Sequence, residues 1–198
     1  MLVYRVHRLW CLLVVALLLN ACTPLIIGGV ATSVGVLHDR RSAGTLVDDK
    51  TILLKALSLS QSDASGKKSS NINVDVYNQR VLLTGQAADR QAINRFVQQV
   101  QAIPQVRQVL NEVQVAAEAG WGDVASAAYL TGKVKLALLD VELEGFDPTR
   151  VLVTSSLGTV YIMGLLTPEE MARVTETVRF VSGVKRVVRL FEHYIPQD

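Results

Sequence analysis

The sequence predicts an α+β fold made of two tandem αββαβ domains, each a mixed three-stranded sheet with two helices on one face. Two observations lead to this prediction: several segments of the chain recur at a long, nearly constant offset, and each copy runs through the same order of helical and strand-like periodicities. A long period that occurs twice indicates tandem domains, because a solenoid needs shorter repeats and at least three of them. The expected boundaries are 46–117 for the first domain, 118–125 for a linker and 126–195 for the second domain.

The repeat consists of three pairs of matching segments. They are 81–85 with 160–164, 94–100 with 172–178, and 103–109 with 181–187. The first pair has an offset one position longer than that of the other two pairs, so one loop is a residue shorter in the second copy.

Each copy opens with a short amphipathic helix, expected near 48–57 in the first copy and near 126–141 in the second. In the second of these helices Leu130, Val134 and Leu138 recur at helical spacing and define its apolar face.

Two strands follow in each copy, because apolar and polar residues alternate there. The alternating apolar positions are Ile72, Val74, Val76, Val81 and Leu83 in the first copy, and Val151, Val153, Val160 and Ile162 in the second. The tight connections at 78–79 and 156–158 predict that each pair of strands is an antiparallel hairpin.

A longer helix and a final strand complete each copy. The expected buried positions of the two longer helices are Ala92, Phe96, Val100 and Ile103, and Met171, Val174, Val178 and Val181. Thr167 and Glu170 form a capping box with Pro168 at the first helical position. The final strands are expected at 106–115 and 184–194, each reached by a right-handed parallel crossover.

The second faces of the two sheets differ in polarity. In the first copy this face carries Asn73, Asp75 and Thr84, which suit water, whereas the second copy has Leu152, Tyr161 and Met163 at the corresponding positions. An apolar face of this size needs a cover. Two interpretations stay open: the face packs against the first copy, or it receives a partner.

Residues 1–22 have the organisation of a bacterial export signal. The apolar residues 9–19 follow two arginines and lead into Leu-Asn-Ala-Cys at 19–22, which is similar to a lipobox. This apolar run is too short to span a bilayer, which needs about 20 residues. We therefore expect residues 1–21 to be a signal peptide.

Cys22 is the expected site of lipidation, by diacylglycerol on its sulfur and an acyl group on the new amine. Lipoproteins of this kind are kept in the inner membrane chiefly when Asp follows the cysteine. Thr23 stands there instead, so the outer membrane is the expected location, with the body on the periplasmic side. Residues 22–45 are glycine-rich and then polar, and they are expected to form a lipidated tether.

Charge and cysteine content exclude several classes of protein. Residues 1–21 contain two Arg and no acid, so the remaining chain has 18 basic and 18 acidic residues. Balanced charge and export both argue against nucleic acid as a partner. Cys11 leaves with the signal and Cys22 is lipidated, so no disulfide, redox motif or cysteine-bound metal is expected, and no cofactor beyond the covalent lipid.

The residue pattern also argues against an enzyme. Beyond the signal the only histidines are His38 in the tether and His193 near the C-terminus. No Gly-x-Ser-x-Gly motif occurs. Glu142, Glu144 and Asp147 cluster after the opening helix of the second copy, where solvated acids are a simpler interpretation than a metal site.

The candidate binding residues lie at the start of the second copy. They are Trp121, Tyr129, Leu130, Lys133 and Lys135. Aromatic, aliphatic and basic side chains around one helix are typical of a peripheral contact with a membrane surface. The alternative is that Trp121 and Leu130 fill the gap between the domains while the lysines are solvated.

The element order, the glycine that closes each second strand, and the lead-in Asp-Arg-Arg-Ser-Ala-Gly at 39–44 together resemble the BON domain family. A lipobox followed by two such copies is similar to the dual-BON outer-membrane lipoproteins. The resemblance implies an αββαβ fold, a periplasmic location, a role in envelope integrity and binding to anionic phospholipid. It also places lipid contact in the stretch around residues 121–135.

Two functional hypotheses follow. In the first, the chain is a non-enzymatic lipoprotein whose second BON domain binds anionic phospholipid. In the second, it is a periplasmic scaffold that docks on an outer-membrane or cell-wall assembly through the apolar sheet face of the second copy.

Overall fold

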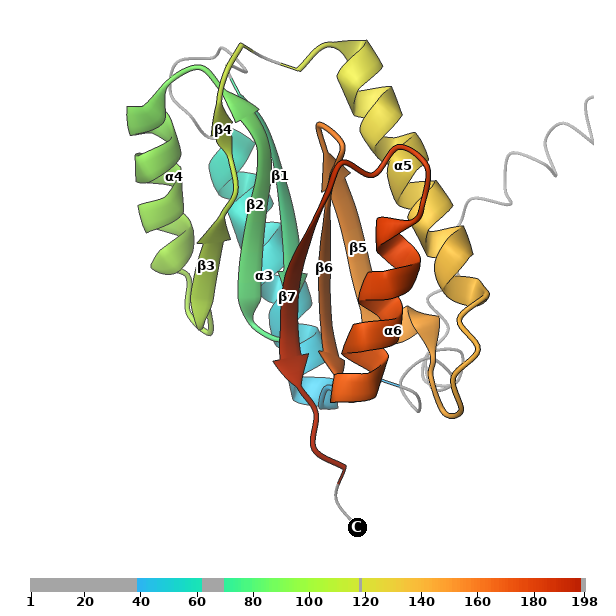
Figure 1. The fold of residues 1–198 in the computed structure, drawn as a ribbon. Helices are drawn as coiled ribbons and strands as arrows, with labels where there is room; N and C mark the ends of the chain where they lie inside the picture. The colour runs from blue at the N-terminus through green and yellow to red at the C-terminus, as the bar shows by residue number, and fades with distance from the viewer. Residues whose placement is uncertain (1–38, 62–69, 118, 197–198) are drawn as a thin grey trace, which may run out of the picture. The chain divides into compact units, whose positions relative to one another are not determined.

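The computed structural model describes residues 39–61, 70–117 and 119–196, which all belong to one compact unit. The expected signal peptide, Cys22 and most of the expected tether lie outside the described residues. The elements of the first copy are α3 (Ala43–Gln61), β1 (Ser70–Tyr77), β2 (Arg80–Ala87), α4 (Arg90–Gln101), β3 (Gln108–Asn111) and β4 (Gln114–Val115). Those of the second are α5 (Trp121–Leu139), a 3-10 turn η2 (Pro148–Arg150), β5 (Val151–Ser156), β6 (Thr159–Leu166), α6 (Pro168–Arg179) and β7 (Arg186–His193). The predicted αββαβ order is confirmed in both copies (Figure 1).

Each copy forms a mixed sheet, as predicted. β1 pairs antiparallel with β2, and β5 pairs antiparallel with β6. The last strand then returns parallel to the second strand: β7 pairs with β6 along its whole length, whereas the first copy divides this strand into β3 and β4, both paired with β2. In the break, the carbonyl of Leu83 accepts from the amide of Glu112 and the side chain of Asn111 accepts from the amide of Val113.

Both hairpins turn through two residues with positive φ. They are Asn78 (52°) with Gln79 (61°), and Leu157 (52°) with Gly158 (81°). Positive φ at both central residues is the I′ geometry that matches the twist of the flanking strands. Gln79 has a side chain that disfavours this conformation, and the carboxylate of Asp49 offsets the cost by accepting from the amides of Asn78 and Gln79 at 2.8 and 2.6 Å.

One hydrophobic core lies between the helices and the sheet of each copy. Its buried members include Ile52 and Ala56 with Phe96 and Val100 in the first copy, and Leu130 and Val134 with Val174 and Val178 in the second. In α4 the buried position is Ile93 rather than the expected Ala92, which is half-buried. The capping box of α6 is confirmed: the Thr167 hydroxyl accepts from the amide of Glu170, and the Glu170 carboxylate accepts from the amide of Thr167.

The opening helices begin earlier than the sequence predicted, so two boundaries change. α3 starts at Ala43, where the Ser42 hydroxyl accepts from the amide of Thr45, and the expected tether therefore ends before residue 45. α5 starts at Trp121, where the Asp123 carboxylate accepts from the amide of Gly120, so most of the expected linker is helix. Both helices have 19 residues, and their first residues keep the offset of the repeat.

The second faces of the two sheets pack against each other. Tyr77 and Leu82 of the first copy form one buried cluster with Tyr161 and Met163 of the second. The apolar face of the second copy is therefore covered by the first, which resolves the two interpretations left open above. The expectation that Thr84 faces water is wrong, because this contact buries its side chain completely.

Candidate functional site

The opening helix of the second copy, α5, has apolar side chains on two opposite sides. Leu130, Val134 and Leu138 face the core. On the other side Trp121 is 92% exposed, Tyr129 71%, Leu136 65% and Leu139 64%. At 3.6 residues per turn these four lie within roughly a quarter of the helix circumference. We call Trp121, Tyr129, Leu136 and Leu139 the outer face of α5.

Small residues separate the large side chains of the outer face. Ala125, Ala128 and Gly132 fall on the same arc of the helix and are exposed. A Cβ added at Gly132 meets no heavy atom within 4 Å. No described part of the chain therefore covers the middle of this face.

Lysines flank the outer face on its two edges. Lys133 donates to the carbonyl of Ser182 at 2.6 Å and lies 5.7 Å from the centre of the Tyr129 ring, as their spacing along the helix suggests. Lys135 is exposed on the opposite edge, close enough to Asp75 of the first copy to act on its charge. An apolar stripe with a positive charge on each edge is typical of an interfacial helix.

The prediction that Leu130 contacts lipid is wrong in this structure. Leu130 is only 7% exposed and packs in the core of the second copy with Val134. The sequence itself indicates that Leu130 is buried, because Leu130, Val134 and Leu138 recur at helical spacing and form the buried stripe. Trp121 does not fill a gap between the domains, since its side chain is almost fully exposed.

Sequence reasoning missed Leu136 and Leu139. Leu136 lies about two turns after Tyr129, and Leu139 lies about five turns after Trp121, so helical spacing could have found both. Phe180, at the C-terminal end of α6, is also 71% exposed, with the Arg179 guanidinium 4.7 Å above its ring. The bond from Lys133 to Ser182 ties the turn after Phe180 to α5.

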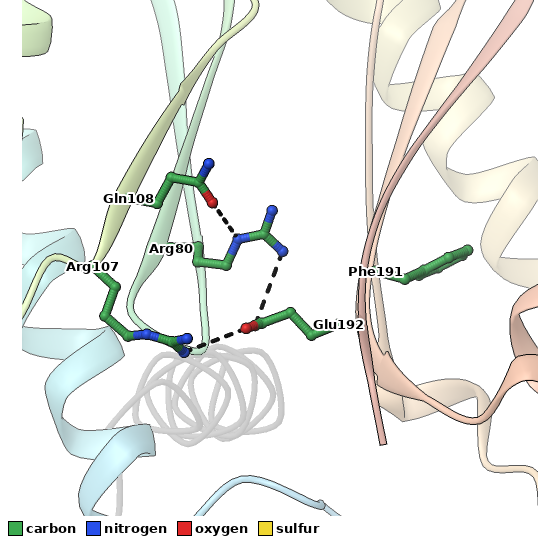
Figure 2. Close-up of a pocket in the computed structure, with 5 residues that line it drawn as sticks. All are labelled: Arg80, Arg107, Gln108, Phe191 and Glu192. Carbon is green, nitrogen blue, oxygen red and sulfur yellow. Dashed lines mark hydrogen bonds and ion pairs between the residues drawn. The ribbon is translucent and has the colours of Figure 1, made fainter. Parts of the chain in front are cut away.

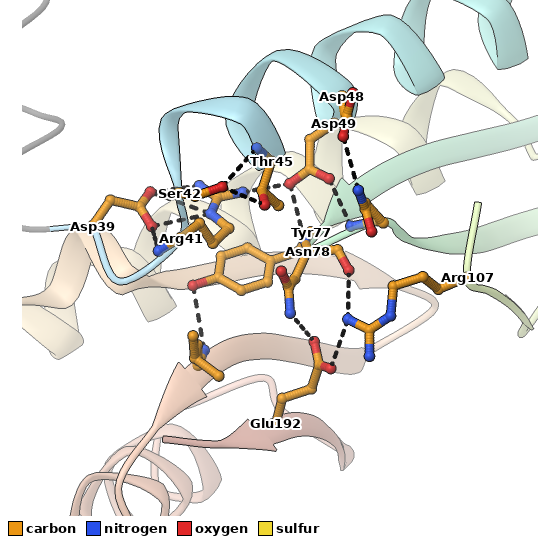
Figure 3. Close-up of polar contacts among 12 residues, drawn as sticks. Asp39, Arg41, Ser42, Thr45, Asp48, Asp49, Tyr77, Asn78, Arg107 and Glu192 are labelled. Atoms are coloured by element: carbon orange, nitrogen blue, oxygen red, sulfur yellow. Dashed lines mark hydrogen bonds and ion pairs between the residues drawn. The ribbon is translucent and has the colours of Figure 1, made fainter. Parts of the chain in front are cut away.

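The lead-in Asp39–Ser42 is the second notable feature, because its two consecutive arginines bind different copies. Arg41 pairs with Asp39 and with Asp49 at 2.7 and 2.8 Å, and its guanidinium lies 4.1 Å from the centre of the Tyr77 ring (Figure 3). The Tyr77 hydroxyl accepts from the amide of Leu165 at 3.2 Å across the interface between the two sheets, which we call the seam. Burial raises the pKa of Tyr77.

Arg40 binds the second copy. Its guanidinium donates to both carboxylate oxygens of Glu170 and to the carbonyl of Leu165 at 3.1 Å, and it lies 4.1 Å from the centre of the Tyr194 ring. Burial alone would raise the pKa of Glu170, but the hydrogen bonds from Arg40 and Thr167 outweigh it and lower the pKa. Arg40 and Arg41 thus join the segment before the first domain to both domains.

A third set of polar contacts closes one end of the seam. Glu192 of β7 accepts from the Asn78 side chain at 2.9 Å and pairs with Arg107 at 3.3 Å and Arg80 at 4.0 Å (Figures 2 and 3). Arg80, Arg107 and Glu192 line a cleft of about 460 Å³, from which Phe191 points away (Figure 2). Arg80 also donates to the carbonyl of Leu190 and to the side chain of Gln108. The residues that line this cleft therefore connect the two domains.

At the other end of the seam, a cavity of about 390 Å³ lies between β1 and the edge of α5. Asp75 and Gln86 of the first copy line it together with Thr154 of the second. Burial raises the pKa of Asp75, against a hydrogen bond from Thr154 and the charge of Lys135. The Oε1 atom of Gln86 is buried and has no hydrogen-bond partner among the described residues.

Within the described ranges, no helix is both long and apolar enough to cross a membrane. No described group of three or more His, Cys, Asp or Glu side chains is arranged to hold a metal ion.

Comparison with known proteins defines the class to which these two copies belong. The BON domain model matches residues 50–117 and 126–192, which is more than half of the chain, and the chain therefore belongs to the BON domain family. Over 94% of its length and 95% of the relative's, it is 29% identical to outer membrane lipoprotein DolP of Haemophilus influenzae. It is also 31% identical to a 21 kDa hemolysin of Actinobacillus pleuropneumoniae, over 78% of this chain and 79% of that protein. The expected pair of BON domains in a DolP-like arrangement is confirmed.

Among solved structures, CdsD of the Chlamydia trachomatis type III secretion system covers 77% of this chain and 93% of its own. The sequence identity is 10% and the TM-score 0.31, too low to bear on function.

Proposed function

We propose that this chain is a non-enzymatic lipoprotein of the outer membrane, anchored by acyl groups on Cys22 with its body on the periplasmic side. In this proposal the second BON domain binds the surface of anionic phospholipid and thereby supports envelope integrity. The full-length similarity to an outer membrane lipoprotein and the sequence at 19–22 support the location.

The outer face of α5 is the observation that carries the lipid-binding part of the proposal. Its four large apolar side chains are far more exposed than a monomeric protein normally leaves in one stripe, and lysines flank them. Inserting such side chains contributes about 1.5–3 kcal/mol each before ordering costs. Each lysine near an anionic leaflet adds roughly 1 kcal/mol.

The lipid anchor and the helix contact have different roles in this mechanism. Two or more acyl chains hold a protein stably to a bilayer, since each buried methylene contributes about 0.8 kcal/mol. The contact through α5 is then not needed for retention. It orients the two domains on the surface and selects the lipid environment, and a weak contact suffices because the anchor keeps α5 at high local concentration.

The scaffold hypothesis requires the apolar sheet face of the second copy to be exposed, and this face is buried. Tyr161 and Met163, the expected docking residues, are 1% and 0% exposed because the first copy covers them. A protein partner that docks on an apolar surface would instead have to use the outer face of α5, and the test below separates that case from lipid binding.

Trp121 is a built-in reporter for this test. The chain has two tryptophans, Trp10 and Trp121, and Trp10 lies in the expected signal peptide. In a Trp10→Phe background, the protein purified from membranes is reconstituted into vesicles that contain brominated phosphatidylglycerol. Insertion of the outer face predicts strong quenching of Trp121, and Leu136→Glu should abolish most of it.

Leu54→Glu is the matched control. Leu54 lies on α3, the equivalent helix of the first copy, and is 68% exposed, against 65% for Leu136. It should leave the quenching of Trp121 unchanged. If Trp121 is not quenched in the wild-type protein, or if Leu136→Glu behaves like Leu54→Glu, α5 does not contact lipid and a protein partner becomes the better explanation of its outer face.

A further inference from the structure

The outer edge of β1 faces the cavity of about 390 Å³ between β1 and α5. Among the described strands, β1 pairs with β2 alone. Every residue from 71 to 75 lines the cavity, although successive side chains of a strand point to opposite faces. The backbone edge of β1, rather than one of its faces, therefore forms this wall.

The pairing of β2 shows which backbone groups of β1 point into the cavity. The carbonyl of Leu83 accepts from the amide of Glu112 on the side of β2 away from β1, and Leu83 lies opposite Val74. Opposite residues of an antiparallel pair alternate between bonded and non-bonded pairs. Val74 and, two positions away, Ile72 therefore direct their N–H and C=O groups away from β2. Residues 71–75 present this edge over about 17 Å.

The wall opposite this edge consists of small residues. They include Ala127 and Ala128 of α5 and Ser155 of β5, whereas Leu57 of α3 borders the cavity beside the core of the first copy. A strand laid along β1 would direct its side chains alternately toward Leu57 and toward α5. A slot between a strand edge and a helix suits a peptide that is added to a sheet as a further strand.

The last strands of the two sheets present less suitable edges. In the first copy this strand is broken between β3 and β4, and in the second the carbonyl of Leu190 in β7 accepts from Arg80. A break or an occupied edge hinders pairing with another chain. β1, by contrast, is continuous over eight residues.

The charge of the lining indicates which peptide the slot suits. Asp75 and Asp123 line the cavity, and no Lys or Arg does. Lys135 offsets part of the charge of Asp75 from outside the lining. Complementary charge favours a partner with a basic side chain at this point.

We propose that the edge of β1 binds an extended, basic segment of a partner protein as an additional strand, with a Lys or Arg side chain of that segment directed at Asp75 and Asp123. This inference goes beyond the proposed function and does not depend on lipid binding. Main-chain hydrogen bonds to Ile72 and Val74 hold the segment, so no exposed apolar sheet face is needed. The chain can then hold a protein partner while the outer face of α5 stays available.

Synthetic peptides test the charge preference. The probe is acetyl-Ser-Val-Lys-Val-Ala-Val-Ser-amide, which alternates valine with small or basic residues. Its Kd for the full chain in detergent is measured by the fluorescence anisotropy of a dye-labelled copy. Replacing its lysine by glutamate should weaken binding at least about five-fold, because attraction to the acidic lining becomes repulsion.

N-methylation of the probe tests the strand pairing. Alternate amides are methylated in two complementary patterns. Only one set of N–H groups of an added strand faces β1, so one pattern should weaken binding at least about ten-fold and the other should retain it. Amide exchange followed by NMR supplies the second readout: the amides of Ile72 and Val74 should exchange faster than that of Asn73 in the unbound protein and become protected when the probe binds.

Ala128→Arg and Ala125→Arg form a matched pair of variants. Both alanines are exposed on α5, and arginine is a good helix former. Ala128 lines the cavity and Ala125 does not. Ala128→Arg should weaken the lysine probe about five-fold, because it adds a positive charge inside the slot. Ala125→Arg adds the same charge outside the slot and should leave the Kd unchanged.

Several outcomes would overturn the proposal. They are equal affinity for the lysine and glutamate probes, no binding of either, or full binding of both methylated patterns. Slow exchange of Ile72 and Val74 in the unbound protein would show that the edge is already paired. A dependence of that protection on concentration would assign it to a second copy, and its absence to another segment of this chain. None of these results bears on lipid binding by the outer face of α5.

Discussion

Gly85 of β2 occupies a position where the neighbouring backbone leaves no room for a side chain. Its φ is 109°, and a Cβ at this position would lie 2.0 Å from the carbonyl oxygen of Asn71. Gly164, the equivalent residue of the second copy, has no positive φ, and its Cβ would lie 3.0 Å from the carbonyl oxygen of Arg150. The two copies share the glycine in sequence but need it for different degrees of close approach.

We therefore expect Gly85→Ala to destabilise the protein more than Gly164→Ala. A non-glycine residue at such a φ costs about 1–3 kcal/mol, and the clash with β1 adds to it. Chemical denaturation of both variants, followed by circular dichroism, measures the difference. Equal losses would mean that β1 moves away from Gly85 without cost.

Asp75 is a residue whose environment opposes its charge. Burial raises its pKa above the ordinary value of 3.8, so the folded state holds its proton more tightly than the unfolded state. Stability is therefore lost as the pH rises from about 3.8 through the raised pKa.

Asp75→Asn should accordingly be more stable than the wild-type protein at pH 7, and the advantage should vanish below about pH 3.8. The amide can still accept from Thr154, so packing is conserved. Thermal unfolding of both proteins between pH 3 and 8 is the measurement. A constant difference across that range would show that ionisation of Asp75 is not its cause.

At the scale of elements, α5 differs from α3 in what its outward side presents. Both helices have 19 residues and bury equivalent positions, Ile52 and Leu130, under their own sheets. Only α5 has a tryptophan, a tyrosine and two leucines on its outer face. The repeat explains the buried side of each helix, and the divergence of the exposed side explains why the second copy is the candidate for lipid contact.

Gly132 offers a gain-of-function test of this face. Gly132→Leu should strengthen Trp121 quenching, since it adds an apolar side chain in open space between Tyr129 and Leu136. It should also stabilise α5 by up to about 1 kcal/mol, because glycine is a poor helix former.

Gly132→Gln separates these two effects. Glutamine is nearly as good a helix former as leucine, so it should give a similar gain in thermal stability but no gain in quenching. If both variants increase quenching equally, helix stability rather than apolar contact controls membrane binding.

At the scale of the whole molecule, the two BON copies act as one body because polar contacts close the seam around an apolar centre. Tyr77, Leu82, Tyr161 and Met163 form the centre, with the Glu192 contacts at one end. The arginines of the lead-in join this body directly to the segment that comes from the proposed membrane anchor. The point at which the tether meets the body is therefore fixed relative to both copies.

Arg40→Gln tests the contacts by which Arg40 joins the lead-in to the second copy. Removing one partner from a buried ion pair costs about 3–5 kcal/mol, and we expect the lower end because Arg150 remains 3.4 Å from Glu170. The Glu170 pKa is lowered in the folded state, so the contribution of the pair is present at pH 7 and is lost as the pH falls below the ordinary value of 4.5 and through the lowered pKa. Urea unfolding at pH 7 and below pH 4 should show the loss shrinking with acidity.

Glu170→Gln completes a double-mutant cycle with Arg40→Gln. Strong coupling at pH 7 that disappears in acid would assign the loss to the ion pair. Additive effects at both pH values would mean instead that Arg40 acts through its packing on Tyr194.

The sequence by itself determined the repeat, the order of elements and the two buried helix stripes. These features depend on periodicity over a few residues, which reflects local geometry and the burial of one side of each element. The tight turn at Asn78 and the cap at Thr167 could be predicted because each depends on a few neighbouring residues. Leu136 and Leu139 were also readable, since the same helical spacing that buries Leu130 exposes them.

Only the tertiary structure decided which surfaces remain open. Arg40 and Glu170 are 130 residues apart, and nothing near either of them indicates the other. The burial of Thr84 and Gln86 could not be predicted from the sequence either. Both are polar residues on an alternating strand, a pattern that indicates exposure to water, but the second sheet covers them. Local pattern sets which side of an element is apolar, whereas the packing of two sheets decides which polar groups are buried with it. In this protein that packing covers the expected docking face and forms the cavity beside α5.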